Sequence, residues 1–171
     1  MIVLVTGASG VGKTTLVKAV EARRIPRLGC YYFDSIGVPP VDEMVRRYGS
    51  GEAWQAAMML EWTKRLVKNA DGVDVAILDG QVRPTFARDA FTEARVTDGR
   101  IVLLDCEAEV REARLHGPRQ QADLASARMT AWAAYLRGQA DALGLPVIDT
   151  TTHTSEQAAS LLLATIGVGA T

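Results

Sequence analysis

The residues best suited to chemistry lie near the start of the chain, in the stretch GASGVGKT from Gly7 to Thr14. It matches the spacing G-x-x-x-x-G-K-[ST] of a phosphate-binding loop, in which backbone N–H groups surround an anion. An apolar, strand-like run (residues 1–5) precedes it, and a segment with one apolar helical face (residues 14–22) follows. Because strand, glycine loop and helix in this order direct N–H groups at an anion, the stretch predicts a nucleoside triphosphate site.

The pattern assigns a role to each part of this loop. Lys13 is expected to reach the β- and γ-phosphates and to act in catalysis, and the Thr14 hydroxyl to ligate Mg²⁺. A glycine-rich turn with a surface lysine is the alternative, and the flanking strand and helix argue against it. The residues expected to contact the nucleotide here are Gly7, Ser9, Gly10, Val11, Gly12, Lys13, Thr14 and Thr15.

Two aspartates follow apolar runs, Asp34 after residues 29–33 and Asp79 after residues 73–78. The carboxyl ends of parallel strands share one edge of a sheet, so both carboxylates are expected beside the phosphate loop. Asp79 fits the strand-terminal carboxylate that holds Mg²⁺. Asp34 is expected to act as a general base or to accept a hydrogen bond from a substrate hydroxyl; the alternative is a helix N-cap. Residues 37–40, GVPP, delay the next helix and favour the functional interpretation.

Strand-like and helix-like segments alternate along the whole sequence. This predicts an α/β fold, a three-layer α/β/α sandwich around a five-stranded parallel sheet, as a single domain over residues 1–171. Pro146 indicates that the last strand lies at a sheet edge. The helices within about 35–70 are expected to bind an acceptor, and residues 117–123 to form a short lid. Strands are expected at 1–5, 29–34, 73–79, 100–105 and 145–149, and helices at 14–22, 40–48, 52–69, 84–95, 107–115, 124–143 and 155–166.

The composition and net charge indicate which classes of binding partner to expect. The chain has 171 residues, of which 48% are apolar and 23% charged, which is ordinary for a soluble globular protein. Its formal net charge of −1 lacks the basic excess of nucleic-acid or membrane surfaces, so neither partner is expected. No run is long enough for a membrane span or an export signal, so a cytoplasmic monomer or homodimer is expected. Cys30 and Cys106 are expected to be buried, reduced thiols.

Taken together, these motifs resemble the P-loop kinases of small molecules, among them nucleoside-monophosphate kinases and shikimate-type kinases. The resemblance covers most of the chain in order. Residues 7–14 resemble the family's phosphate loop, and DGQVR at 79–83 is similar to the D-G-x-x-R of nucleotide kinases. Residues 105–117 resemble the strand and helix that lead into the lid, and residues 149–151 the loop that borders the base.

The resemblance implies ATP and Mg²⁺ as cofactors and further site residues. Arg114 would cover the adenine ring and, with Arg119 of the lid, close over the transferring group. Arg83 would contact transferred or acceptor phosphate, and Thr150 would border the base. The lid has no cysteine, so no zinc-bound lid is expected. Arg111, one helical turn before Arg114, is a weaker candidate than these.

The resemblance divides at the acceptor. DEMVR at 42–46 is reminiscent of the acceptor helix of adenylate-type kinases, whose arginine, here Arg46, holds a monophosphate. Asp34 instead resembles the shikimate and gluconate type, which phosphorylate an alcohol. A hydroxyl needs a positioned base, whereas a phosphate is already an anion and needs arginines. Asp34 therefore favours a hydroxyl acceptor, while Arg46, Arg47 and Arg83 leave an anionic acceptor open.

The expected function is ATP- and Mg²⁺-dependent transfer of the γ-phosphate to a small-molecule hydroxyl, such as that of a nucleoside-like metabolite. Lys13, Asp34, Arg114 and Arg119 are the expected catalytic residues, and Asp34, Arg46, Gln81 and Arg83 the expected acceptor-binding residues. The alternatives are a nucleoside monophosphate kinase and an NTPase switch in which Gln81 activates water. A polynucleotide 5′-hydroxyl kinase and a nucleotide-binding module without turnover are less favoured.

Overall fold

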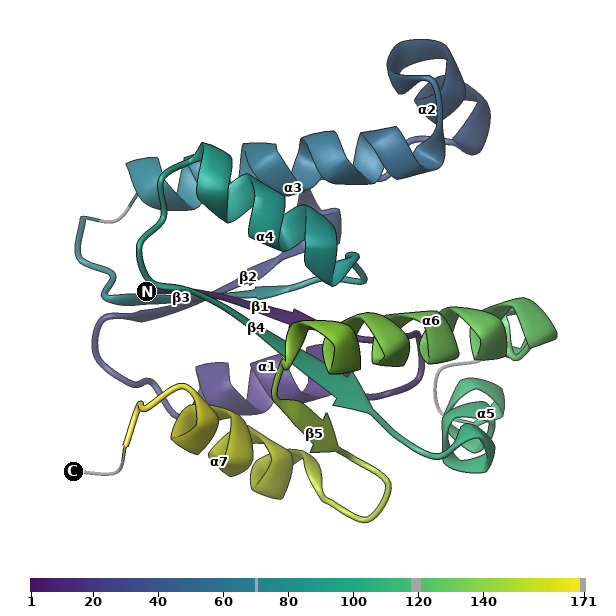
Figure 1. Cartoon of the computed structure of the whole chain (residues 1–171). Helices are drawn as coiled ribbons and strands as arrows, with labels where there is room; N and C mark the ends of the chain where they lie inside the picture. The colour runs from purple at the N-terminus through teal and green to yellow at the C-terminus, as the bar shows by residue number, and fades with distance from the viewer. Residues whose placement is uncertain (70, 118–120, 170–171) are drawn as a thin grey trace.

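A computed structural model of the chain describes residues 1–69, 71–117 and 121–169. Its centre is a sheet of five parallel strands in the order β2-β3-β1-β4-β5, as Figure 1 shows. The predicted five-stranded parallel sheet is therefore confirmed, and β5 does lie at an edge. The strands are β1 (Ile2–Thr6), β2 (Leu28–Tyr32), β3 (Val75–Asp79), β4 (Gly99–Asp105) and β5 (Val147–Asp149).

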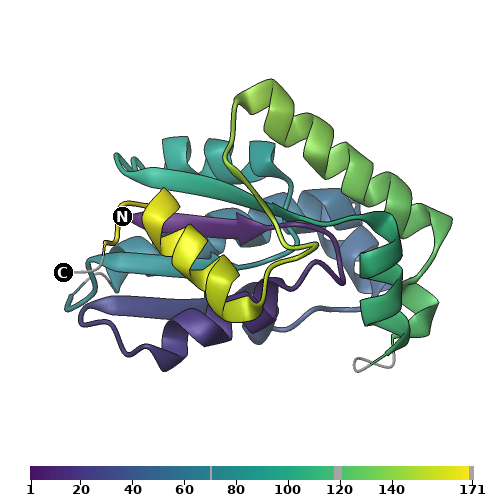
Figure 2. The same cartoon turned by 90° about the horizontal axis from the view of Figure 1, so that it is seen from below.

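Helices cover both faces of this sheet. In Figure 1, α3 and α4 lie over one face and α1 and α7 over the other, and Figure 2 shows the second face from below. The predicted three-layer sandwich is thus confirmed. The helices are α1 (Lys13–Ala22), α2 (Val41–Tyr48), α3 (Gly51–Lys68), α4 (Pro84–Glu93), α5 (Ala108–His116), α6 (Ala127–Leu143) and α7 (Ser155–Thr165), with 3₁₀ helices η1 (Phe33–Ile36) and η2 (Ala122–Leu124).

The central strand β1 explains why the two faces are held together. All five of its residues are buried, and successive side chains point to opposite faces. Val3 and Val5 join the core beneath α1 and α7, while Ile2 and Leu4 join the core beneath α3 and α4. A strand covered on both faces needs an unbroken apolar sequence, which is the pattern that this run shows. The phosphate loop therefore starts from a rigid, fully buried support.

The second strand ends earlier than the expected range 29–34. Pairing between β2 and β3 stops at Tyr32, which lies opposite Asp79. The chain then turns into η1, where Phe33 is buried and its carbonyl accepts a hydrogen bond of 3.0 Å from Trp62 Nε1. Asp34 consequently lies in a 3₁₀ turn just beyond the sheet edge instead of at the end of a strand.

Both cysteines have free thiols, as expected, although Cys30 is only half-buried while Cys106 is buried. Burial, with a smaller contribution from the charge of Glu21, raises the pKa of Cys30 to about 11. Burial also raises the pKa of the Cys106 thiol. None of the described helices combines the length and the apolar character that a membrane span requires.

Candidate active site

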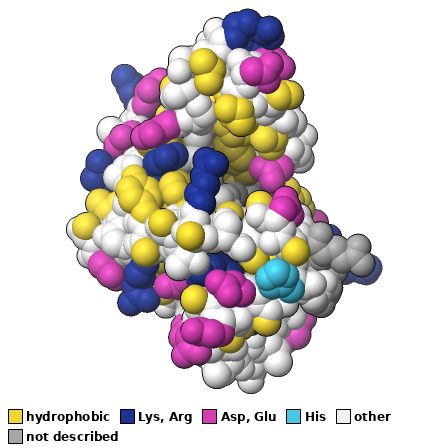
Figure 3. Space-filling model, turned by 90° about the vertical axis from the view of Figure 1, so that its right-hand side faces the viewer, with side chains coloured by type: hydrophobic (Ala, Val, Ile, Leu, Met, Phe, Trp, Pro, Cys, Tyr) yellow, Lys and Arg dark blue, Asp and Glu magenta, His cyan; other side chains and the backbone are white. Residues whose placement is uncertain are grey.

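The expected site residues gather at the carboxyl edge of the sheet. The strands run from left to right in Figure 1, and Figure 3 looks directly at the edge where they end. The loops that follow β1, β2, β3 and β5 meet there, and the space-filling view shows a hollow between the upper helices and the rest of the molecule. A ligand in this hollow lies at the point where an open α/β sheet binds its substrates.

The loop after β1 leaves the N-terminus of α1 open to an anion. Gly12 precedes the helix in a left-handed conformation with φ of 96°, no side chain caps it, and its first turn contains no acidic residue. The first N–H groups of the helix and its dipole are thus available to a phosphate. Gly10 lies so close to α5 that an added Cβ would be 2.8 Å from Cγ of Arg111. The loop therefore has one packed side and one open side.

Lys13 is the first residue of α1 and is buried, with 9% of its surface exposed. Its Nζ donates a 3.0 Å hydrogen bond to the carbonyl of Ala8, within the same loop. The ammonium group is therefore buried within the loop that the sequence pattern predicts to bind phosphates.

Thr14 and Asp79 form the oxygen pair expected to hold a metal. The register of β1 with β3 pairs Val5 with Asp79, which brings that carboxylate beside the loop. Thr14 Oγ1 donates to Asp79 Oδ2 at 2.5 Å, and Asp79 is 7% exposed. Oxygen ligands of this kind suit Mg²⁺, which takes few protein ligands and completes its shell with phosphates and water. No cluster of three or more His, Cys, Asp or Glu that could hold a metal occurs among the described residues.

A cavity of about 380 Å³ lies beside the loop, on the side of α7. Arg114 Nη2 donates to the carbonyl of Thr150 at 2.6 Å, and its Nη1 donates to Thr150 Oγ1 at 3.0 Å. The same hydroxyl donates to the carbonyl of Val11 at 2.7 Å. These bonds fix a planar guanidinium in the cavity wall, where it can stack on an aromatic base. The cavity is lined in part by Val11, Thr15, Leu16, Arg114, Thr150, His153 and Ala158.

The loop after β5 is ordered by its own hydrogen bonds. Hydrogen bonds from the side chain and the backbone N–H of Thr151 lower the pKa of the Asp149 carboxyl. The His153 ring lies 2.8 Å from the carbonyl of Asp149 through Nδ1, and Thr154 caps α7. Sequence reasoning identified Thr150 but missed His153 and Thr154, because their place in the cavity depends on the course of this loop.

Thr150→Val is expected to weaken ADP binding roughly tenfold, since it removes the hydroxyl that links Arg114 to Val11 and each such bond contributes about 1 kcal/mol. Titration calorimetry with ADP checks the change. Thr92→Val is the matched control, because the Thr92 hydroxyl bonds only within the exposed part of α4. Equal affinities of the two variants would show that the link does not support the nucleotide.

On the opposite side of the phosphate loop, Asp34 is exposed in η1. It follows by two residues Tyr32, which pairs with Asp79, so it lies on the same edge as the Thr14–Asp79 pair. No described residue hydrogen-bonds or ion-pairs with its carboxylate. This carboxylate is therefore available to a ligand.

Gln81 and Arg83 are connected to the phosphate loop by a chain of hydrogen bonds. Ser9 Oγ donates to Gln81 Oε1 at 2.8 Å, and Gln55 Nε2 of α3 donates to the carbonyl of Gln81 at 2.9 Å. Arg83 Nη1 then donates to Gln55 Oε1 at 2.9 Å. The turn after β3 is thus fixed to both the nucleotide loop and the helix that borders the acceptor side.

Aromatic rings enclose the Arg83 guanidinium. Its Cζ lies 4.8 Å from the ring centre of Trp132, 5.3 Å from that of Phe86 and 5.8 Å from that of Tyr135. Glu52 Oε2 lies 3.4 Å from its Nη2. Sequence reasoning missed Glu52, Trp132 and Tyr135, because a tryptophan at helical spacing is typical of core packing and nothing local connects α6 with Arg83.

Three other arginines differ in their surroundings. Arg46 is exposed on α2, which packs on α3 at the outer end of the molecule (Figure 1). Arg111 is 3% exposed, and its Nη2 donates to Thr130 Oγ1 at 3.2 Å, which links α5 to α6. Arg119 and the centre of the expected lid lie outside the described residues. The structure therefore brings Arg114 and Arg83, but not Arg46, into contact with the loops at this edge.

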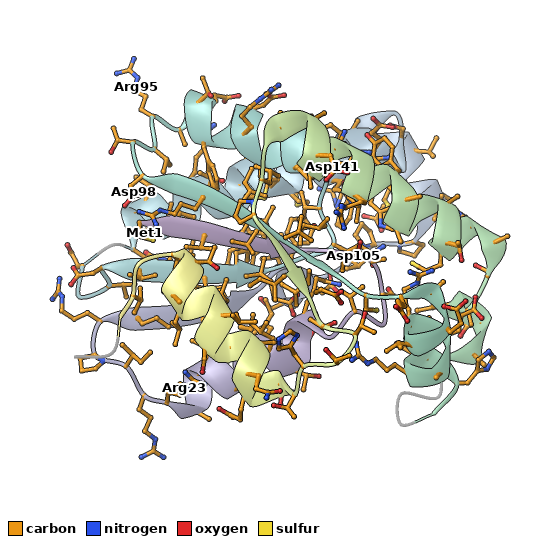
Figure 4. The ribbon with its side chains drawn as sticks, turned by 60° about the horizontal axis from the view of Figure 1, so that its bottom comes forward. Met1, Arg23, Arg95, Asp98, Asp105 and Asp141 are labelled. Atoms are coloured by element: carbon orange, nitrogen blue, oxygen red, sulfur yellow. The ribbon has the colours of Figure 1, made fainter. Side chains whose placement is uncertain are left out.

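Asp105, which ends β4, shows what a structural strand-terminal aspartate looks like. Its Oδ1 accepts from the N–H of Cys106 at 3.0 Å, and its Oδ2 lies 3.5 Å from Nη1 of Arg137 on α6. Figure 4 shows it where β4 passes beneath α6. Asp79 and Asp105 both end apolar strands at this edge, but Asp79 meets Thr14 while Asp105 caps its own loop.

Comparison with protein families and with curated proteins found no match. Solved structures with the same fold cover nearly the whole chain. A tunicamycin resistance protein from Deinococcus radiodurans has a TM-score of 0.69 at 17% identity, over 99% of this chain and 96% of that one. Shikimate kinase from Acinetobacter baumannii, in complex with shikimate, has a TM-score of 0.63 at 13% identity, over 99% and 95%. A gluconokinase from Sinorhizobium meliloti 1021 has a TM-score of 0.61 at 16% identity, over 97% and 91%. The chain has the fold of these proteins, among them the shikimate kinase and the gluconokinase, as predicted.

Proposed function

We propose that the protein is an ATP- and Mg²⁺-dependent kinase that transfers the γ-phosphoryl group to a hydroxyl of a small molecule. The observation that carries the proposal is that Asp34, whose carboxylate pairs with no described residue, lies on the same edge as the Lys13 loop and the Thr14–Asp79 pair. A base, a phosphate site and a metal pair at one edge are the parts that alcohol phosphorylation needs. Kinases of shikimate and of gluconate share the fold.

In this reaction the loop N–H groups and Lys13 bind the β- and γ-phosphates. Thr14 and Asp79 would hold Mg²⁺, which when bound compensates the negative charge of these phosphates. Asp34 accepts the proton of the acceptor hydroxyl while the oxygen of that hydroxyl forms a bond to the γ-phosphorus. The bond between the γ-phosphorus and the oxygen that bridges it to the β-phosphate breaks, which releases ADP. Arg114 orients the adenine base of ATP, and Arg119 is proposed to approach the phosphates from the lid.

The charge around Asp34 favours a hydroxyl over a phosphate acceptor. Between residues 34 and 55 the sequence has four carboxylates and two arginines, which gives a negative balance. One of those arginines, Arg47, is paired with Glu43 at 3.0 Å. A monophosphate or dicarboxylate is negatively charged and would be repelled by this negative surface, whereas a neutral alcohol would not.

The proposal is tested by measuring ADP release from ATP and Mg²⁺ in the presence of each candidate acceptor. The candidates are nucleosides, nucleoside monophosphates, sugar acids, shikimate-like alcohols and drugs of the aminoglycoside and chloramphenicol type. Stimulation by an alcohol, removed by EDTA and restored by Mg²⁺, is expected. Stimulation by monophosphates alone would replace the proposal with a nucleotide kinase in which Arg46 holds the acceptor. Slow hydrolysis that ignores every compound would instead support an NTPase.

Arg83→Lys is expected to raise the acceptor KM about tenfold and to leave the ATP KM unchanged. Lysine keeps the charge but loses the planar group that stacks on Trp132 and bonds Gln55, an arrangement worth about 1–2 kcal/mol. Steady-state kinetics with either substrate varied measure both constants. The control is Arg88→Lys in α4, the helix that directly follows Arg83; the Arg88 guanidinium is exposed and, among the described residues, bonds only Asp89. A rise in the ATP KM instead would place Arg83 on the nucleotide side.

A further inference from the structure

A second cavity, of about 360 Å³, lies between η1, α2 and α3 and is lined by residues 36–39, which follow Asp34 closely in the sequence. It is separate from the cavity beside Arg114 and falls within the volume range of small-molecule sites, about 300–1,000 Å³. Its wall is mostly hydrophobic and includes two aromatic rings. The apolar and aromatic side chains that line it are Ile36, Val38, Pro39, Tyr48, Trp54 and Met58.

Exposed valines continue this hydrophobic surface outward. Val38, Val41 and Val45 are 53%, 71% and 51% exposed, and they make up half of the six large hydrophobic side chains that the described chain exposes. Val41 and Val45 are four residues apart and so share one face of α2, while Met44 is buried against α3. Figure 3 shows hydrophobic side chains along the wall of the hollow below the upper helices. Valine is a weak helix former, and an exposed helix face needs none, so folding does not account for this surface.

The cavity offers little to a negative charge. Arg47 is the one cationic side chain that lines it in the described part of the chain. Its Nη1 lies 3.0 Å from Glu43 Oε1, and its Cζ lies 5.6 Å from the ring centre of Tyr48. A carboxylate such as that of gluconate or shikimate would have to compete with Glu43 for this cation. A neutral, apolar group would meet hydrophobic walls instead.

We infer that the acceptor is a neutral alcohol with a bulky apolar or aromatic body, which occupies this cavity while its hydroxyl meets Asp34. The inference rests on the proposed function, because it takes Asp34 as the base. Val38, next to the turn that carries Asp34, and Met58 and Trp54 of α3 then determine specificity by the shape and polarity of the cavity. Small anionic hydroxy acids are excluded as good substrates.

The test compares Val38→Asp with Val67→Asp, at two valines of similar exposure. Val67 is 47% exposed near the end of α3 and lines a different cavity, so its variant is the matched control. Binding of the neutral fluorescent dye Nile red is measured with ADP and Mg²⁺ present, after thermal melts show that both variants fold. The wild type and Val67→Asp are expected to bind the dye equally, and Val38→Asp at least about tenfold more weakly, because a carboxylate there is desolvated by the ligand. Equal binding by all three proteins would overturn the inference.

A kinetic comparison separates failure of this inference from failure of the proposed function. ADP release is measured with phenyl and octyl glucosides, methyl glucoside, gluconate and shikimate. A glucoside with an apolar group as best acceptor, with a KM raised in Val38→Asp and an unchanged kcat, supports the inference. Gluconate, shikimate or methyl glucoside as best acceptor overturns it and leaves the kinase function standing. Dye binding that depends on Val38 without stimulation by any alcohol overturns the kinase function, and the acceptor role of the cavity with it.

Discussion

Lys13→Ala is expected to abolish measurable phosphoryl transfer, with kcat lowered roughly 10²- to 10³-fold or more, while the fold persists. An effect of about this size is expected when one preorganised group that stabilises the charge developing in the transition state is removed. In this protein the Lys13 ammonium is buried in the loop and bonds the carbonyl of Ala8 at 3.0 Å. Alanine cannot replace either its charge or its reach. Acceptor-dependent ADP release at saturating ATP measures the loss.

The matched control for this variant is Lys18→Ala. Lys18 is exposed five residues further along α1, so its removal changes net charge and helix composition equally but leaves the phosphate loop intact. Melting temperatures within a few degrees for the two variants would show that the fold is kept, since alanine is the best helix former. Full activity of Lys13→Ala would contradict the whole assignment of the loop.

The phosphate loop could be predicted because its information is local. The conformation of Gly12, the open helix end and the place of Lys13 follow from adjacent residues, and β1 supplies support through its own apolar sequence. The Thr14–Asp79 bond joins residues far apart, but it follows from two strand ends that must share an edge. The shared carboxyl edge of a parallel sheet was therefore enough to predict that pair.

The acceptor side could not be predicted to the same depth. The stacking of Arg83 on Trp132 requires α4 and α6 to meet, and its bond to Gln55 requires α3, so three helices fix one side chain. Similarly, the sequence ranks Arg114 above Arg111 only through the family resemblance, because no local pattern shows which contacts each side chain makes. Only the packing of α6 gives Arg111 its bond to Thr130, and only the loop after β5 gives Arg114 its bonds to Thr150.

Asp34→Asn is expected to remove acceptor-dependent ADP release, by a factor of roughly 10²–10⁴, while ADP binding and background hydrolysis stay as in the wild type. General-base catalysis contributes an effect of about this size. Asparagine keeps the shape and can still accept a hydrogen bond from a hydroxyl, but it cannot take the proton. Because Asp34 is exposed and no described residue pairs with it, its replacement is not expected to destabilise the fold.

This variant decides between the two acceptor classes, since each makes a different residue essential. The control is Asp42→Asn, an exposed aspartate in the first turn of α2 that shares the charge change. If Asp34→Asn keeps the acceptor-dependent ADP release while Arg46→Ala loses it, the acceptor is an anion. Asp34 then has only a structural role in the η1 turn. If Asp34→Asn alone loses stimulation at an unchanged acceptor KM, the carboxylate acts on the proton and not on binding, which is the difference between a base and a substrate contact.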